Sequence, residues 1–542
     1  MKTKDVNLDA LIPREDFVID DQPSQASGIE KISIVHLEGP FFGPDLRKPD
    51  FQRETDKWSP SKVADLIQSF VDGNLIPAVI LWRAGQYVFV IDGSHRLGAL
   101  MAWIQDDYGD RKTSLDYFGG IIPEEQRKIA ERTRRLVNKQ VGPYQDYLAA
   151  RANPAGARPE IQKRLSNLAV NHIIAQWVPR TDKESAEDSF FKINQSATPI
   201  DPTERRILKS RRSASAIAAR AIARAGTGHK YWGDFDKDTR TAIETLGAKL
   251  WKALYVPPIT GNAVTTLDVP VAGRGYSTLS FIFDLVNEAN GVEIQDSTAK
   301  NTKTKDVLPV DENGQTTVEY LKTVEKRVQR ITGDSPGSLG IHPVVYFYTR
   351  SGAFQPTALI AASRFLEELA SKDKLKEFTK VRRKFEEFLI LHKEALSLII
   401  HKLGSGERHI PWLQKYYSLI LDRLWAGKSF DKIQTSFSKN PDFAFVTAPQ
   451  PSGVRQFSTK SKHKFSSGTK TAAFFAAALP GGARCHLCGA LLHLNSVHTD
   501  HVVRARDQGT ADMRNAKPAH PYCDSAKDVL EPLLKKSAAG SR

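Results

Sequence analysis

The chain has 542 residues and a net charge of +15, with 77 Lys and Arg residues against 62 Asp and Glu residues. This length predicts several domains, each large enough to bury a core of its own. No apolar run is long enough to span a membrane, and the first residues contain no apolar signal core, so neither a transmembrane segment nor an export signal is expected. These properties favour a soluble, cytoplasmic protein with a polyanionic partner.

The excess positive charge is concentrated near the C-terminus. Residues 451–542 contain 14 Lys and Arg residues against 6 Asp and Glu residues, so this segment carries a charge of +8. A charge that serves only solubility would be spread more evenly, whereas binding of a phosphate backbone concentrates it where the nucleic acid lies. The predicted contacts to nucleic acid are Lys460, Lys462, Lys464, Arg504 and Arg506.

The chain is predicted to begin with an irregular polar segment, residues 1–30, followed by a domain over residues 31–215. Ser59 and Pro60 are typical of a helix start, as N-cap and first helical residue. Apolar residues then recur on one helical face as far as Gly73, which suits a helix end.

Two buried strands are predicted after this helix. AVILW follows Pro77, and YVFVI follows a turn at residues 83–86. The loop DGSHR comes next, and LGALMAWI reads as a helix. Residues 111–215 are expected to be mainly helical.

The loop Asp92-Gly93-Ser94-His95-Arg96, between a strand and a helix, is a candidate phosphate site. Free backbone N–H groups at a helix start and a guanidinium group both favour a phosphate. Gln52 and Arg53, some forty residues upstream, are predicted to join this site. The alternative for Arg53 and Arg96 is an ion pair with Asp92 or a neighbour that holds the fold.

These residues together resemble the ParB/sulfiredoxin-like superfamily. The resemblance is closest to its DGQQR or DGQHR branch, which occurs in GmrSD-type modification-dependent restriction enzymes and in phosphorothioate-sensing defence nucleases. It implies a nucleotide site, for GTP or ATP, at Gln52, Arg53 and residues 92–96. Ser94 stands where the family has Gln, and its side chain is shorter. Asn194 and Glu204 match a further family segment, with a helix cap and a solvated acid as the alternatives.

The middle of the chain, residues 216–436, is predicted to be a helical domain. Its amphipathic runs include TALIAASRFLEELA and RKFEEFLILHKEALSLIIHKL. Residues 437–470 are rich in Ser, Lys, Gly and Pro and are expected to form a basic linker. A last domain is predicted over residues 471–542, with a short helix at its start.

All three cysteines lie in this last domain, which argues against a disulfide framework and for a metal site. Cys485 and Cys488 form a CxxC pair, and His520 and Cys523 form an HxxC pair with the same spacing. Two such pairs can close a tetrahedral zinc site, which would be structural because no ligand position stays open. The alternative is a coincidence of two unrelated pairs.

A second set of residues lies between and beside the zinc pairs: Asp500-His501, Asn515 and Asp524. The combined pattern over residues 483–528 resembles the HNH nuclease family, whose fold is a ββα-metal unit. The resemblance implies that His501 is the general base, that Asp500 and Asp524 bind a catalytic Mg²⁺ or Mn²⁺ ion, and that Asn515 orients His501. The family most often has Asn or His where this chain has Asp524.

The expected fold class is therefore α+β and multidomain: an N-terminal α/β ParB-like domain, a helical middle and a C-terminal HNH module with structural zinc. The expected function is that of a metal-dependent DNA endonuclease in prokaryotic restriction or antiphage defence, gated by nucleotide binding. One nuclease site would nick, so nicking or assembly into a homo-oligomer is implied, and proteins of the same defence system are further candidate partners. The alternatives are a DNA-binding regulator without turnover and an RNA-directed nuclease.

Overall fold

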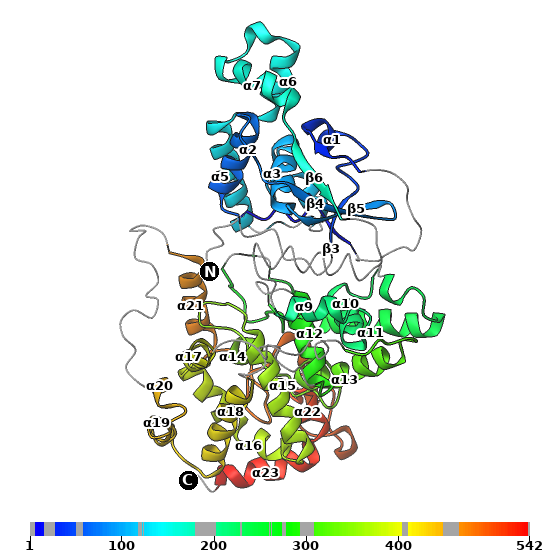
Figure 1. The fold of residues 1–542 in the computed structure, drawn as a ribbon. Coiled ribbons are helices and arrows are strands. Elements are labelled where there is room, and N and C mark those ends of the chain that lie inside the picture. Colours follow the sequence, from blue (N-terminus) through cyan, green and yellow to red (C-terminus); the bar gives the residue numbers. More distant parts are fainter. Residues whose placement is uncertain are drawn as a thin grey trace. The chain divides into compact units, whose positions relative to one another are not determined.

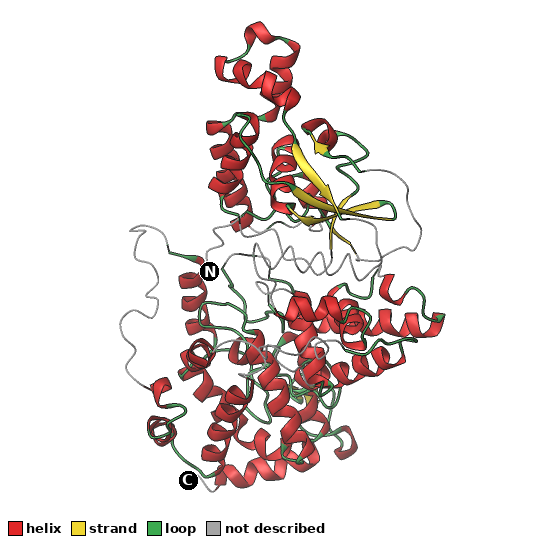
Figure 2. Cartoon of the chain, viewed as in Figure 1, coloured by secondary structure: helices red, strands yellow, loops and turns green. Residues whose placement is uncertain are grey.

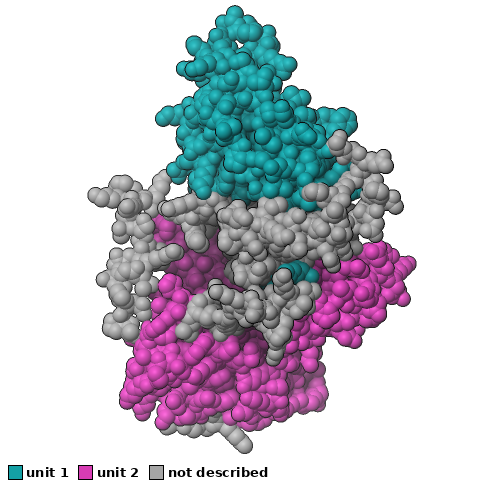
Figure 3. Space-filling model, in the orientation of Figure 1, with its two compact units in different colours: residues 1–209 teal, residues 210–542 magenta. Residues whose placement is uncertain are grey.

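The structure is a computed structural model in which the chain divides into two compact units, residues 1–209 and residues 210–542 (Figure 3). Each unit is described by itself. The described residues are 6–15, 28–49, 58–117, 122, 124–178, 202–227, 230–259, 261, 263–273, 278–292, 308–403, 410–447 and 465–539.

The first unit is built on a mixed sheet with the strand order β1-β3-β5-β4-β6-β2 among its described residues. β4 and β5 are an antiparallel pair, whereas β3 pairs with β5, and β4 with β6, in parallel. The strands are β1 (Arg14–Glu15), β2 (Lys31–Ile32), β3 (Leu46–Pro49), β4 (Val79–Ala84), β5 (Tyr87–Asp92) and β6 (Ile173–Trp177).

The predicted helix, strands and loop around residue 80 are confirmed. Helix α2 (Pro60–Val71) begins at Ser59, whose hydroxyl accepts a hydrogen bond from the Lys62 backbone N–H. The predicted four-residue turn is wrong, because β4 and β5 each extend further and only Gly85 and Gln86 connect them. Gly85 has φ +55°, as two-residue hairpin turns require.

The expectation that residues 111–215 are mainly helical holds for five helices among the described residues but misses β6. The sequence IIAQW is short, yet its first four residues alternate between buried and exposed positions, as a strand requires. This strand lies beside β4 in the sheet. The helices are α4 (Lys112–Tyr117), α5 (Glu124–Gln140), α6 (Tyr144–Ala152) and α7 (Pro159–Val170), and α9 (Pro202–Lys209) ends the unit.

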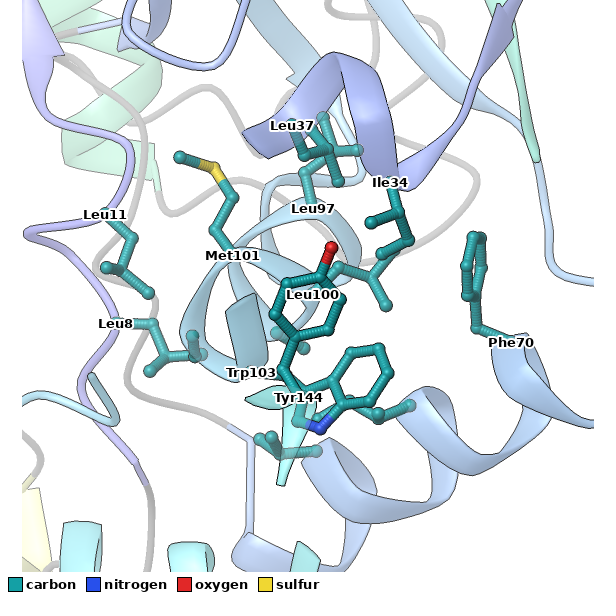
Figure 4. Close-up of a cluster of buried hydrophobic side chains, with 14 of the residues drawn as sticks. Leu8, Leu11, Ile34, Leu37, Phe70, Leu97, Leu100, Met101, Trp103 and Tyr144 are labelled. Atoms are coloured by element: carbon teal, nitrogen blue, oxygen red, sulfur yellow. The ribbon is translucent and has the colours of Figure 1, made fainter. Parts of the chain in front are cut away.

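The core of this unit gathers around helix α3 (Ser94–Gln105), which directly follows β5 (Figures 1 and 4). Trp103 is fully buried, donates a hydrogen bond to the Gly142 carbonyl and meets the Tyr144 ring edge-on at 5.0 Å. Further side chains of the core come from the N-terminal segment, from α1 (Ile34–Glu38) and from α2: Leu8, Leu11, Ile34, Leu37 and Phe70. The packing fixes the start of α3, and with it the loop at residues 92–96.

The second unit is mainly helical (Figure 2), as predicted for its larger part. α10 (Ala214–Ala223) packs against α11 (Lys237–Tyr255), α12 (Thr278–Ala289) and α13 (Gln315–Ile331). The remaining helices before the C-terminal module are α14 (Pro343–Tyr346), α15 (Pro356–Ser371), α16 (Leu375–Leu391), α17 (Glu394–Leu403), α18 (Ile410–Trp425), α19 (Phe430–Ser438), α20 (Ala444–Thr447) and α21 (Ser467–Ala478).

Aromatic residues form the centre of the second unit. The Phe365 ring stacks on Phe385 at 5.9 Å, and Tyr417 lies within 6.1 Å of both rings. All three are buried. This aromatic packing joins α15, α16 and α18 into one body.

The C-terminal module belongs to the same compact unit as these helices. It consists of a hairpin and two helices: β7 (His498–His501), β8 (Ala516–Ala519), α22 (Pro521–Ser525) and α23 (Lys527–Ala539). β7 and β8 are antiparallel, with Asp500 opposite Lys517. None of the helices among the described residues is both long and apolar enough to cross a membrane.

Candidate functional site

The structure brings Cys485, Cys488, His520 and Cys523 together as a buried cluster. One ligand atom from each lies within 4.8 Å of the others. His520 Nδ1 is 3.4 Å from Cys488 Sγ and 3.9 Å from Cys523 Sγ. Hydrogen bonds with Cys488 and Cys523 lower the pKa of the Cys485 thiol, and the hydrogen bond with Cys485 raises the pKa of the Cys523 thiol.

This donor set fits a structural zinc ion. Three sulfur atoms and one imidazole nitrogen are its usual ligands, and burial of all four leaves no position for a substrate. A divalent cation would also balance the negative charge that three crowded thiolates carry. When bound, the ion links the CxxC turn to the start of α22.

The backbone of the second unit orients the histidine ligand. His520 Nε2 donates to the Leu491 carbonyl at 3.0 Å, which directs Nδ1 to the thiols. The Leu491 N–H in turn donates to the Glu386 carboxylate at 2.9 Å. Glu386 lies on α16 and pairs with Arg382 at 2.8 Å, both side chains being fully buried. A chain of hydrogen bonds therefore runs from the helical body to the zinc site.

A segment between α13 and α14, residues 333–342, also covers the module, and we call it the strap. Tyr522 N–H donates to the Ser338 carbonyl at 2.9 Å, and the Ser525 hydroxyl donates to the Pro336 carbonyl at 2.8 Å. Gly340, at φ +58°, lies so close to His520 that a Cβ atom would come within 2.6 Å of its ring. Only glycine suits this position of the strap.

The Asp500 carboxylate is buried between the side chains of Lys527 and His486. Lys527 Nζ lies 2.9 Å from one carboxylate oxygen and 3.0 Å from the other, and His486 Nε2 lies 2.6 Å from the first. Lys527 also donates to the carbonyls of His501 and Val502. Lys527, on α23, therefore holds the end of β7 in place.

His501 ends β7 with an exposed side chain, as a base acting on water requires. Asn515 fixes the residues that follow it. The Asn515 amide donates to the Val503 carbonyl at 2.8 Å, its oxygen accepts from the Val503 N–H at 2.6 Å, and its backbone carbonyl accepts from the Val502 N–H at 2.8 Å. Asn515 thus orients the backbone beside His501, and no contact to the His501 ring is part of this arrangement.

Asp524 lies in α22 and is about one-third exposed. His498 Nδ1 lies 3.0 Å from its carboxylate, and His498 Nε2 lies 3.1 Å from the Asp334 carbonyl of the strap. His498 is therefore a positioning residue for Asp524, held from both sides of its ring.

Asp500 and Asp524, the predicted ligands of the catalytic Mg²⁺ or Mn²⁺ ion, do not form a metal site together. Among the residues that the structure describes, the Cys3His cluster is the one group of three or more His, Cys, Asp or Glu ligands gathered closely enough for a metal. Asp500 is occupied by Lys527 and His486, and Asp524 is occupied by His498. Hard carboxylate ligands are present, but in this arrangement they do not fit a divalent ion together.

In the first unit, the loop at residues 92–96 begins α3. Gly93 has φ +99°, and a Cβ atom there would come within 2.5 Å of Val79. Arg96 donates to the Asp92 carboxylate at 2.7 Å and to the Ala78 carbonyl at 3.1 Å. For Arg96, the structure shows the alternative that the sequence left open, an ion pair with Asp92 that holds the fold. Ser94 is buried at the start of α3.

His95 lies at the centre of a charged cluster that the sequence did not reveal. Its ring stacks on Trp58 at 5.3 Å. Burial and the nearby Lys48 lower its pKa to about 4, against the opposing effect of Asp9. Lys48 itself is fully buried and pairs with Asp9 at 2.5 Å. A neutral imidazole, a lysine and an aspartate therefore meet beside the predicted phosphate loop.

Several predicted site residues lie outside the described part of the structure: Gln52, Arg53, Asn194, Lys460, Lys462 and Lys464, and the side chain of Glu204 is not described either. Arg504 and Arg506 are described, and both pair with Asp528 on α23. Their ion pairs are at the surface, where such pairs contribute little and can be exchanged for phosphate.

The sequence missed the residues that support the site. Lys527 lies within residues 483–528, the stretch that resembles the HNH family, but it was not assigned a role there. His486 lies between the two cysteines of the CxxC pair. Its backbone N–H donates to the Pro518 carbonyl of β8, and its ring contacts Asp500. Glu386 and Gly340 had none, since their contacts to the module span over a hundred residues of sequence.

Comparison with known families gives one match. Residues 37–212 match the family model described as the N-terminal domain of the GmrSD restriction endonuclease. No curated protein and no solved structure is similar to the chain. The match supports a GmrSD-type N-terminal region and covers most of the first unit, including the loop at residues 92–96.

Replacing Glu386 with Gln is expected to weaken zinc binding by roughly 10- to 100-fold, the usual effect of losing an outer-shell partner. It should also reduce the free energy of unfolding by about 3–5 kcal/mol, because Arg382 is left buried without its counter-charge. Competition with a chromogenic chelator measures the first effect, and urea unfolding the second. Glu387→Gln, which removes only a surface pair with Arg383, is the matched control. Equal zinc retention in both variants would refute the link from α16 to His520.

The first unit is expected to lose stability as the pH falls from about 6.5 to about 4. The folded state holds His95 neutral down to a pKa of about 4, whereas an unfolded chain protonates it near 6.5. Protonation therefore favours the unfolded state over this range, and the loss levels off below it. His95→Gln should flatten the pH dependence of unfolding, measured by hydrogen exchange of core amides in the first unit. His172→Gln, an exposed histidine of the same unit, should leave it as in the wild type.

Proposed function

We propose that this chain is a DNA endonuclease of a restriction or antiphage defence system. The match of residues 37–212 to a restriction-endonuclease domain supports the class of function. The observation that carries the chemistry is strand β7, which ends at the exposed His501, in the same module as the buried Cys3His cluster. Residues 471–542 are proposed to be an HNH-type nuclease, and residues 31–215 a ParB-like domain that binds nucleotide and gates it.

In the proposed reaction, His501 is the general base. Its imidazole takes a proton from a water molecule, whose oxygen attacks the phosphorus while the bond to the 3′-oxygen breaks. The 3′-oxygen leaves with the bonding electron pair and takes a proton from solvent water. Lys527 and Asn515 keep the end of β7 rigid, so that the imidazole does not have to be ordered during the reaction. The HNH resemblance implies a Mg²⁺ or Mn²⁺ ion at Asp500 and Asp524. Both carboxylates are paired within the chain and do not fit that ion together, so no step is derived through it.

The proposed substrate is DNA, and the proposed location is the cytoplasm. A single nuclease site would cut one strand, so nicking or pairing of two chains is part of the proposal. The linker predicted at residues 437–470 begins with folded residues, because α20 lies within it and Phe437 and Phe443 are buried. Lys460, Lys462 and Lys464, from its later part, are proposed to contact DNA in addition to Arg504 and Arg506.

One observation favours a second candidate, a DNA-binding regulator without turnover. Asp500 is neutralised by Lys527 within the structure, whereas a working metal ligand has to be free of such a pair. A nuclease directed at RNA is the third candidate, since the hydrolysis would be the same. The next experiment separates all three.

His501→Ala is expected to lower cleavage of supercoiled plasmid by about 10²- to 10⁴-fold, the usual contribution of a general base. Relaxed and linear products are measured with Mg²⁺, with Mn²⁺ and with EDTA, and RNA is the parallel substrate. His401→Ala, an exposed histidine of the same unit, should cleave as the wild type does. Wild-type binding without cleavage would select the regulator, and products that persist in His501→Ala would refute the assigned base.

Arg96→Ala is expected to reduce phosphate release from GTP or ATP by about tenfold or more. A charge-assisted hydrogen bond of this kind contributes about 1.5–3 kcal/mol. The free phosphate is measured with the full chain, with and without plasmid. Arg111→Ala, which removes a partly exposed arginine of the same unit, is the control. Equal release from Arg96→Ala and wild type would leave Arg96 as a purely structural partner of Asp92.

A further inference from the structure

The loop between β7 and β8, residues 502–515, leads directly away from His501 and is tightly held. Asn515 closes it with side-chain hydrogen bonds to Val503 and Thr510, at 2.6 to 2.8 Å. Asp512 accepts from the Arg514 N–H at 2.8 Å and from the Thr510 hydroxyl at 2.7 Å. The loop therefore has a fixed backbone, although it lies on the surface.

This rigid loop displays apolar side chains to the solvent. Met513 is 92% exposed, and Val502 and Val503 are 40% and 50% exposed. Burying a methionine typically stabilises a protein by about 1.5–3 kcal/mol, and here that contribution is not used within the chain. A flexible loop could fold such a side chain away, whereas this one holds it outward.

Positive charge surrounds the apolar side chains. The Arg514 side chain is 96% exposed, and its nearest carboxylate, Asp512, is 3.9 Å away and already serves the loop. Residues 502–517 hold four Lys and Arg residues against two Asp residues, a charge of +2. Arg504 and Arg506 pair with Asp528 of α23, which leaves Arg514 and Lys517 as the cations nearest Met513 in the sequence. A narrow apolar tip flanked by cations suits a nucleic acid better than an apolar protein face.

We propose that Met513 is a wedge that enters between neighbouring base pairs of duplex DNA beside the cut site, while Arg514 and Lys517 bind the adjacent phosphates. This inference rests on the proposed function. Apolar wedges unstack a base step and kink the duplex, at a cost of a few kcal/mol per step. Flexible pyrimidine–purine steps resist this least, so cleavage should favour TA and CA/TG steps near the site.

The test uses the full chain in a His501→Ala background, so that DNA stays intact. Short duplexes carry 2-aminopurine at successive positions, and its fluorescence increases where a base is unstacked. We expect an increase at one step on binding, lost in Met513→Ala, which still binds, and retained in Met513→Leu. Leu494→Ala is the control, because Leu494 is 62% exposed in the same unit but lies outside the loop. Arg514→Ala should lower the slope of log affinity against log salt by about one.

The outcomes separate the wedge from the nuclease. An increase that persists in Met513→Ala overturns the wedge, and so does duplex binding and wild-type cleavage without any increase. A chain that neither binds nor cleaves duplex DNA overturns the proposed function as well. A Met513→Ala variant that instead changes from dimer to monomer in light scattering, with unaltered fluorescence, would show that the loop contacts a second copy of the chain.

Discussion

The buried carboxylate of Glu386 links the helices of the second unit to the C-terminal module. It balances Arg382, whose guanidinium also binds the carbonyls of Leu339 and Gly340. It also accepts the Leu491 N–H, and the Leu491 carbonyl contacts His520 of the Cys3His cluster. Two fully buried charges are stable only when each is paired and hydrogen-bonded. The helical body, the strap and the Cys3His cluster therefore depend on one another.

Local patterns were enough to predict the local features. The helix at residues 60–71, the strands on either side of Gly85 and the four members of the Cys3His cluster followed from periodicity, capping and spacing, because these act over a few residues or through chemically distinctive side chains. The strand at 173–177 was missed because five residues with a weak alternation do not stand out between helices. Its place beside β4 is a matter of tertiary pairing.

The polar residues around His95 and around Asp500 could not be predicted from local sequence patterns. Lys48 and Asp9 lie in different segments and meet only because β3 and the N-terminal residues pack around His95. Lys527 and Asp500 meet across the C-terminal module, so that a residue predicted to bind metal is paired with an ammonium group instead. Residue types predict which chemistry is available, whereas the state of each group depends on neighbours that the fold supplies.

Gly340 shows how far the C-terminal module extends beyond its own sequence. A glycine some 180 residues before the histidine ligand is required for the ring of His520 to fit. Grafting residues 471–542 onto another protein, or exchanging them for a related module, would therefore leave the zinc site without its cover. A transferable unit has to include the strap and α16, so recombination between such genes is restricted to breakpoints that keep these segments together.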